Sequence, residues 1–495
     1  MRETRQRVLS KGGVMNRMMI CAIVVLAGVA SAAQPRRETQ ASSQLPVDSE
    51  LRKILSERIK GFENRASITL GVIGPQGRRI VSYGAAGPGS SKPADGDTIY
   101  EIGSITKVFT ALLLADAVER HESALDTPVA RYLPRDVTVP RRAGRLITLA
   151  DLATHRSGLP RMPSNFAPSD QLNPYPDYSV ERLYQFISSY QLERDVDSEF
   201  DYSNLGAGLL GHALARRAGT SYETLLRRRV LGPLKMSSTG ITLSPTLKTR
   251  LAQPQSSAFQ LVSTPAWEFT DAFAGAGALR SSAVDMLKFL SAAIGYSRTS
   301  LSGAMARMLA VRRDGTTAFK MGLGWRVEDV EGTQIVWTGG ATYGSRSFAG
   351  YDPKARVGVV VLSNYNSGSG IDDIGRHVLN PRLPLDGGRA VKPRARIAST
   401  VPTRLMDAYA GRYRFSDNDI WTVRRGGNRY FIKRPGAEEF EIFPEGDFEN
   451  GSDDFFTPSI DALFTFDFEP TSPTRANHLT FSWGFFDPRH AVRID

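Results

Sequence analysis

Two short motifs in this chain carry residue types that could transfer an acyl group through a serine. Ser104 and Lys107 stand three residues apart, and Tyr202 follows about a hundred residues later. A serine hydroxyl is a poor nucleophile unless a base accepts its proton. A lysine becomes that base only when burial or neighbouring positive charge lowers its pKa. The Ser-Lys pair alone is a weak signal, because both residue types are common.

The residues around Ser104 predict that the pair stands at the start of a helix. Apolar side chains at positions 108, 111, 112 and 115 follow the helical period. A spacing of three places Ser104 and Lys107 on one face of the first turn. The N–H groups at a helix N-terminus can also stabilise an oxyanion that develops beside them.

The second motif is Tyr202-Ser203-Asn204, which precedes a helix-like stretch. The phenol of Tyr202 could relay protons, helped by the ammonium group of Lys107. The amide of Asn204 could hold the Lys107 amine and a substrate amide. Asn204 is equally typical of a helix N-cap, so the motif alone leaves a purely structural role open.

A third motif, Trp337-Thr338-Gly339-Gly340, is a predicted strand that ends in two glycines. A substrate could lie against this strand edge and bond to its main chain, because no Cβ blocks the approach. An ordinary exit from a strand into a turn explains the same residues.

The order of these motifs resembles that of the class C β-lactamase and low-molecular-weight penicillin-binding-protein superfamily, which includes family VIII esterases and D-amino-acid peptidases. The resemblance covers about residues 51–380. Further segments that match the superfamily in the same order are 147–160, 275–282, 322–325 and 348–353. The tail from Tyr409 resembles the β-barrel appendage of some members.

This resemblance implies a role for each residue of the motifs. Ser104 would be the nucleophile and Lys107 its base, while Tyr202 would act as general acid and base in acylation and deacylation. Asn204 would position the substrate amide. The backbone N–H groups of Ser104 and Gly340 would form the oxyanion hole. Nucleophile, base, proton relay and oxyanion donors complete an acyl-transfer site.

The third motif departs from the superfamily, where it often begins with lysine or histidine. A cation there would help bind a substrate carboxylate, worth about 1.5–3 kcal/mol as a charged hydrogen bond. Trp337 instead offers an apolar wall beside Thr338 and Gly339, as in some esterase-type members. Arg346 could supply the missing charge, or could be a solvated strand arginine.

Other chemistries receive little support from the sequence. No Gly-x-Ser-x-Gly is present, so His155 is interpreted as a structural histidine at a helix end rather than part of a Ser-His-Asp triad. The sequence has no His-Glu-x-x-His and no Cys/His cluster, so we expect neither a metal nor another cofactor.

Composition is that of a packed globular protein. The 495 residues are 41% hydrophobic and 23% charged, which excludes a disordered, collagen-like or multi-span membrane chain. A single cysteine excludes an intrachain disulfide. The net charge of +11 is spread along the chain and favours anionic envelope polymers or carboxylated small molecules over nucleic acid.

The N-terminus is predicted to be a signal peptide over residues 1–32, cleaved near Ala32, because a basic start precedes a short apolar run and Ala-x-Ala. Either Met1 or Met15 could be the start. A permanent anchor is the alternative, but the run is short for the roughly 20 residues of a span. We therefore expect a periplasmic or secreted protein without stable membrane insertion.

The remainder divides into a polar leader (33–50), a serine hydrolase domain (51–381), a linker (382–402) and a small β-barrel or sandwich (403–495). The expected fold of the larger domain is α+β and β-lactamase/transpeptidase-like, with an antiparallel sheet flanked by helices and an all-helical lobe. Predicted elements are a helix over 51–59 and strands over 67–73, 79–83, 334–338, 346–351 and 357–363.

Together these observations predict an exported serine hydrolase that acts on β-lactam or D-amino peptide amide bonds, in a small or peptidoglycan-derived substrate. Two alternatives remain. One is a carboxylesterase of the family VIII type. The other is a penicillin-binding sensor or cell-wall binding protein that is acylated without turnover. The sequence does not identify a protein partner.

Overall fold

The computed structural model describes residues 45–90, 92–257, 262–366, 370–386, 398–417, 419–436, 438–446, 448, 452–458, 462–471, 473–483 and 488–495. The predicted signal peptide, its cleavage site near Ala32, the alternative starts and most of the predicted linker lie outside these residues. Among the helices that are described, none is both long and apolar enough to cross a bilayer.

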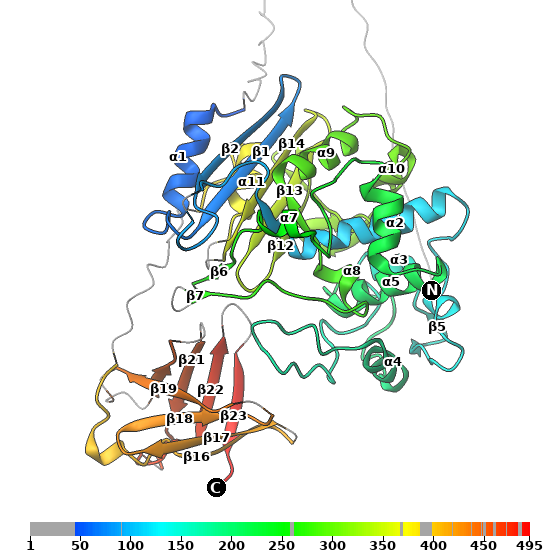
Figure 1. Cartoon of the computed structure of the whole chain (residues 1–495). Helices are drawn as coiled ribbons and strands as arrows, with labels where there is room; N and C mark the ends of the chain where they lie inside the picture. Colours follow the sequence, from blue (N-terminus) through cyan, green and yellow to red (C-terminus); the bar gives the residue numbers. More distant parts are fainter. Residues whose placement is uncertain are drawn as a thin grey trace, which may run out of the picture. The chain divides into compact units, whose positions relative to one another are not determined.

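An antiparallel sheet of eight strands forms the centre of the larger domain (Figure 1). Its strand order is β2-β1-β14-β13-β12-β11-β10-β9. Each of the five strands predicted from apolar patterning is present in it. The strands are β1 (Ser67–Gly74), β2 (Gly77–Gly84), β9 (Arg313–Thr316), β10 (Phe319–Met321), β11 (Arg326–Val330), β12 (Thr333–Ala341), β13 (Arg346–Asp352) and β14 (Val357–Ser363).

Helices cover both faces of this sheet, which explains why β14 is an unbroken apolar run. Val359 and Val361 belong to an apolar cluster with α1 (Asp48–Arg58) and α11 (Asp372–Leu379). Val360 and Leu362 belong to the cluster that contains α2 (Thr106–Glu119) and α9 (Ala283–Ala293). Successive side chains therefore enter two different cores.

Helix α1 begins at Asp48, before the helix start predicted at residue 51. The Glu50 carboxylate accepts a hydrogen bond from the Val47 N–H at 3.0 Å, and Asp48 adds a second acid in the first turn. Both carboxylates stabilise the N-terminus of α1, because the helix dipole is positive there. The last residues of the predicted polar leader are thus part of α1.

The remaining helices of the larger domain include α2 (Thr106–Glu119), which follows a 3₁₀ turn, η1 (Gly103–Ile105). Residues 106 to 116 of α2 are all buried, as expected for a helix in the middle of a domain. The others are η2 (Val129–Tyr132), α3 (Leu149–Ala153), α4 (Val180–Ser189), α5 (Asn204–Arg217), α6 (Tyr222–Leu226), η3 (Arg227–Leu231), α7 (Pro245–Lys248), α8 (Ala274–Gly277) and α10 (Ser302–Ala310).

The C-terminal domain is a closed antiparallel barrel, as the sequence predicted (Figure 1, orange to red). Buried Phe464 and Phe466 flank half-buried Thr465, which is the alternation of a barrel strand. The strands are β16 (Gly411–Ser416), β17 (Asp419–Gly426), β18 (Arg429–Lys433), β19 (Phe440–Glu445), β20 (Ser452–Phe456), β21 (Ala462–Asp467), β22 (His478–Trp483) and β23 (Arg489–Arg493).

The end of β12 packs directly against the chain that leads into η1. A Cβ atom at Gly340 would lie 2.1 Å from the Ile102 carbonyl oxygen and 2.4 Å from Ser347 Oγ. The Ser347 hydroxyl donates a hydrogen bond to the same carbonyl at 2.7 Å. Glycine is therefore required at position 340 for β12 to approach the start of α2 this closely.

Gly340→Ala is expected to push β12 away from Ile102, because the obstructing atom is backbone that cannot rotate aside. The free energy of unfolding of the larger domain should fall by about 1–3 kcal/mol, the usual cost of overpacking. Chemical denaturation followed by tryptophan fluorescence measures this change.

Gly74→Ala, at the end of β1, is the matched control. Its new Cβ would meet only side-chain atoms, the nearest at 3.3 Å. A loss of stability for Gly340→Ala no larger than for Gly74→Ala would contradict the close approach of β12 to Ile102.

Candidate active site

Ser104, Lys107 and Tyr202 meet at the start of α2. Lys107 Nζ donates a hydrogen bond to Ser104 Oγ at 3.0 Å. The hydroxyl of Tyr202 donates to the same oxygen at 2.6 Å. Lys107 is buried and Ser104 is partly exposed. Tyr202 is partly exposed like Ser104, so of the three side chains only that of Lys107 is enclosed by the protein.

Tyr202 is held in place by the N-terminus of α5. The N-cap is Ser203, whose Oγ accepts from the Gly206 N–H at 2.8 Å. This corrects the structural interpretation of Asn204, which is the first residue of α5 rather than its cap. Capping requires a side-chain oxygen that reaches the N–H groups of the first turn, and Ser203 supplies it.

His155 packs beside Tyr202 and stays neutral. Its ring centroid lies 4.6 Å from that of Tyr202, and its Nδ1 accepts from the Ser203 N–H at 3.2 Å. Burial, with the Lys107 charge nearby, lowers the pKa of His155 to about 3. A neutral imidazole can accept this bond, which agrees with the structural role predicted for His155.

The surroundings of Lys107 favour its neutral amine. Burial lowers the pKa of Lys107, and the positive charges of Arg161 and Arg326 lower it further, although Tyr202 opposes them. The amine also donates to the Ala276 carbonyl oxygen at 2.6 Å. The net pKa is below the usual lysine range, as a base at neutral pH requires.

Tyr202 shows the complementary shift. Burial is the largest single effect and raises the pKa of its phenol. The charge of Lys107, the hydrogen bonds with Lys107 and Ser104 and the charge of Arg161 together outweigh it. The net pKa lies below the usual tyrosine range. The Lys107 ammonium lies 4.9 Å from the centre of the tyrosine ring. These two groups can therefore exchange a proton at low energetic cost.

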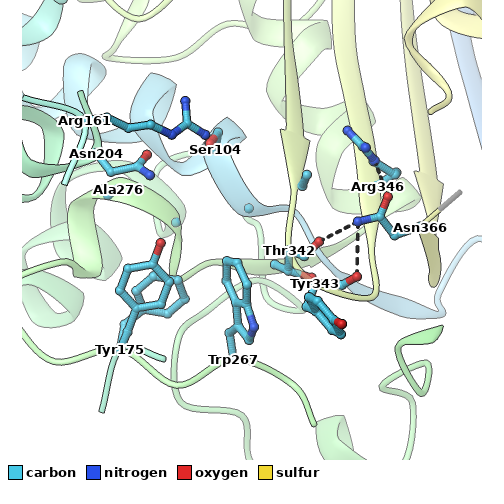
Figure 2. A pocket seen from close by; sticks show the side chains of 14 residues that line it. Ser104, Arg161, Tyr175, Asn204, Trp267, Ala276, Thr342, Tyr343, Arg346 and Asn366 are labelled. Atoms are coloured by element: carbon cyan, nitrogen blue, oxygen red, sulfur yellow. Dashed lines mark hydrogen bonds between the residues drawn. The ribbon is translucent and has the colours of Figure 1, made fainter. Parts of the chain in front are cut away.

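A cleft with a volume of about 200 Å³ opens beside Ser104 (Figure 2). Among the predicted site residues, Ser104, Asn204 and Arg346 line it. The other lining residues are Gly103, Arg161, Tyr175, Trp267, Phe269, Ala276, Gly277, Ala341, Thr342, Tyr343 and Asn366.

Asn204 faces the cleft without contacting the lysine. Its Nδ2 lies 3.7 Å from the Met162 sulfur, and the Ala276 carbonyl, not the Asn204 amide, holds the Lys107 amine. The amide of Asn204 lines the cleft at a position from which it can reach a bound molecule.

Trp337 does not line this cleft. It is 6% exposed and stacks on Phe348 with ring centroids 5.7 Å apart. The guanidinium carbons of Arg326 and Arg376 lie 4.8 and 5.4 Å from its ring centre. Its side chain enters the same apolar cluster as α11. The Trp337 side chain thus packs β12 against this cluster, and the guanidinium groups of Arg326 and Arg376 pack on its ring.

The rest of the third motif contributes backbone rather than side chains. Thr338 is buried, and Gly339 lies beside the Asp372 carboxylate of α11. Gly340 is the residue that packs against the Ile102 carbonyl. The cleft begins one residue later, at Ala341.

Arg346 reaches the cleft from the start of β13. Its Nε donates to Asn366 Oδ1 at 2.6 Å. The Asn366 amide donates to the carbonyls of Thr342 and Tyr343 at 2.9 and 3.1 Å, which Figure 2 shows as dashed lines. Burial lowers the pKa of Arg346, and the Asp372 carboxylate opposes this effect. The side chain is therefore oriented rather than freely solvated.

Sequence reasoning missed several residues of the cleft. Arg161 directly follows a segment that matched the superfamily, so its neighbourhood was identified but its side chain was not. Tyr175 and Phe269 stack with centroids 4.4 Å apart and form an aromatic wall with Trp267. These aromatic residues come from irregular loops without periodicity, so no pattern could have located them.

Nothing in the described ranges resembles a metal centre, since no three His, Cys, Asp or Glu side chains converge there.

Comparisons with known proteins found relatives of this chain in sequence and in structure. AmpH, a D-alanyl-D-alanine-carboxypeptidase/endopeptidase of Escherichia coli K12, is 28% identical over 322 residues, which are 62% of this chain and 80% of AmpH. A class C beta-lactamase structure from Rhodobacter sphaeroides is 26% identical with a TM-score of 0.57, covering 68% of this chain and 98% of that one.

The beta-lactamase/D-alanine carboxypeptidase of Yersinia pestis shares the fold at 24% identity, with a TM-score of 0.58 over 68% of this chain and 97% of that chain. The predicted β-lactamase/transpeptidase-like fold is thus confirmed. The Beta-lactamase family model matches residues 55–379. With this match over most of its length, the chain belongs to the beta-lactamase family.

Proposed function

We propose that this chain is an exported serine hydrolase that cleaves amide bonds through an ester on Ser104. The proposed substrates are β-lactams or peptides that end in a D-amino acid. The observation that carries the proposal is the position of Ser104 Oγ, 3.0 Å from the Lys107 amine and 2.6 Å from the Tyr202 hydroxyl, at the edge of a cleft.

In the acylation step, Ser104 Oγ bonds to the substrate carbonyl carbon and gives its proton to the neutral amine of Lys107. The Tyr202 hydroxyl, in contact with Ser104 Oγ, passes a proton to the leaving nitrogen and recovers one from Lys107. The carbon–nitrogen bond then breaks, and the acyl group remains on Ser104. The lowered pKa values of both partners support this exchange.

The oxyanion is assigned to the backbone N–H groups of Ser104 and Gly340. The packing of Gly340 against Ile102, just before η1, brings β12 close to the nucleophile. Fixed backbone donors of this kind stabilise charge that develops in the transition state. In deacylation, Tyr202 and Lys107 take a proton from water, and the water oxygen bonds to the acyl carbon. The bond between that carbon and Ser104 Oγ then breaks, and Oγ receives the proton, which regenerates the serine hydroxyl and releases the acid.

The substrate class rests on the cation at the far side of the cleft. Arg346 is oriented by Asn366 and can bind a carboxylate on the leaving group. Both β-lactams and peptides with a free C-terminus carry such a carboxylate, whereas a simple ester does not. Amide substrates are therefore preferred over the esterase alternative. AmpH, a relative by sequence, is named for the same chemistry.

Export is proposed from the N-terminal sequence alone, whose basic start, apolar run and Ala-x-Ala precede the first described residue. Its substrate would then be met in the periplasm or outside the cell, where peptidoglycan-derived peptides and β-lactams occur.

Ser104→Ala is expected to lower kcat/KM by at least about 10³-fold, because it removes the hydroxyl that is proposed to accept the acyl group. The assay compares nitrocefin, a peptide ending in D-Ala-D-Ala and a short-chain p-nitrophenyl ester with one preparation of mature protein. Ser302→Ala is the matched control, since Ser302 is exposed on α10 and bonds only to the Thr299 carbonyl.

Each outcome of this assay has a distinct meaning. Undiminished hydrolysis by Ser104→Ala ends the proposal. Turnover of the ester alone identifies a carboxylesterase. A stable penicillin adduct without turnover identifies a sensor. Turnover of nitrocefin or the peptide, lost in Ser104→Ala only, is the expected result.

The pH dependence tests the electrostatics of Lys107. The Arg326 charge lowers the pKa of Lys107, so Arg326→Gln should raise it. Because the neutral amine is the proposed base, kcat/KM rises with pH as Lys107 deprotonates. The acid limb of the pH profile should therefore move to higher pH in Arg326→Gln.

Arg326→Lys is the control, because it keeps the positive charge and should leave the acid limb near its original position. The measurement is kcat/KM across the acid limb for all three proteins. An acid limb that stays in place, or moves to lower pH, in Arg326→Gln would contradict the proposed role of Lys107 as base.

A further inference from the structure

Two arginines line the cleft, and they stand on different sides of it. In Figure 2, Arg161 and Asn204 are on one side, next to Ser104, and Arg346 and Asn366 are on the other. Arg161 comes from the loop after α3, whereas Arg346 comes from the first position of β13. One carboxylate cannot satisfy both cations when they stand on opposite sides.

The backbone at Arg161 is anchored at the site. Its carbonyl oxygen accepts hydrogen bonds from the N–H groups of Asn204 and Leu205, at 3.1 and 3.2 Å. The loop and the start of α5 are therefore fixed to one another. The guanidinium carbon of Arg161 lies 5.2 Å from the centre of the Tyr202 ring. Such stacking on an aromatic ring limits the rotamers of an arginine and keeps its charge near the ring.

Arg161 has no acidic side-chain partner among the described residues, in contrast to Arg346. It is exposed, and among the described residues its guanidinium forms no hydrogen bond or ion pair with a side chain. Arg346, by contrast, bonds to Asn366 and has the Asp372 carboxylate nearby. Arg326 packs against the ring of Trp337. Arg161 is thus a positioned charge at the cleft that the protein itself leaves uncompensated.

We propose that Arg161 binds a negatively charged group on the acyl part of the substrate, so that the preferred substrates carry an anion on each side of the bond that is cleaved. This inference rests on the proposed function, in which Arg346 takes the carboxylate of the leaving group. A substrate that spans the cleft with its carbonyl at Ser104 then directs its acyl part toward Arg161 and Asn204.

The chemistry of this pair selects a carboxylate. A guanidinium presents parallel N–H donors that match a carboxylate in a bidentate arrangement. The amide of Asn204, which lines the same side of the cleft, can donate to the carbonyl that links the acyl side chain. The preferred acyl donor is therefore a peptide or amide whose acyl portion carries an acidic side chain.

The test uses two esters with one leaving group. Mono-p-nitrophenyl glutarate has a carboxylate on the acyl side, and its methyl ester has none. The measured quantity is the ratio of kcat/KM for the anionic ester to kcat/KM for the neutral one. This ratio should fall about tenfold, or about 1.4 kcal/mol, in Arg161→Gln.

Two controls separate charge from structure. Arg161→Lys keeps the charge and should keep part of the preference. Arg298→Gln removes an exposed arginine remote from the cleft lining and should leave the ratio at its wild-type value. A ratio in Arg161→Gln equal to that of wild type would overturn the inference.

The wild-type protein provides a second measurement that requires no variant. Raising KCl from about 10 mM to about 1 M shortens the Debye length from about 30 Å to 3 Å, so the preference for the anionic ester should decline. A preference that is absent at low salt also overturns the inference, even if Arg161→Gln does not fold.

The same data distinguish this inference from the proposed function. If the wild type turns over esters with no preference for the anion, the inference fails alone and the serine hydrolase proposal stands. If the wild type turns over neither ester, carbenicillin and benzylpenicillin replace them, since they differ in the same carboxylate on the acyl side. No turnover of any of the four overturns this inference, whereas the serine hydrolase proposal is decided separately by nitrocefin and the peptide ending in D-Ala-D-Ala.

Discussion

The shared contact of Ser104 Oγ with an amine and a phenol is the interaction on which the rest of the site depends. An ammonium group beside the Ser104 hydroxyl could only stabilise that hydroxyl. A neutral amine at the same distance can remove the proton of the hydroxyl. The difference is set by surroundings that no single residue provides. Lys107 is buried in the first turn of α2, and Arg161 and Arg326 add positive charge from two other segments. Burial, the charge of Arg161 and the charge of Arg326 therefore each lower the free-energy cost of keeping the Lys107 amine neutral.

The architecture keeps these groups together through tight backbone packing. Strand β12 reaches the start of α2 because residue 340 has no side chain, and Ser347 bonds to the same Ile102 carbonyl that Gly340 approaches. The N-terminus of α5 fixes Tyr202 through the Ser203 cap and the neutral ring of His155. The nucleophile thus lies between a sheet edge and a helical lobe, and each contributes part of the chemistry.

Sequence patterns predicted what depends on residue type and spacing, and missed what depends on the path of loops. The apolar run at 357–363 predicted β14, because its residue types are those of a buried strand. The Ser-x-x-Lys motif at a helix start predicted the site, because the order of the motifs along the chain identifies it. The alternation of β12 could not tell which face Trp337 would occupy, because helices bury both faces of the sheet. The Ala276 carbonyl that holds Lys107 has no sequence signal at all, since every residue has a carbonyl. Arg161 was overlooked because its loop has no period.

The most direct test of the central claim is mass spectrometry of the acid-quenched protein after brief exposure to benzylpenicillin, followed by peptide mapping. Opening the β-lactam ring adds the whole molecule to the nucleophile. The account predicts this added mass on the peptide that contains Ser104, forming more slowly in Tyr202→Phe. Consumption of the penicillin with no covalent intermediate, or an adduct on a different residue, would contradict it.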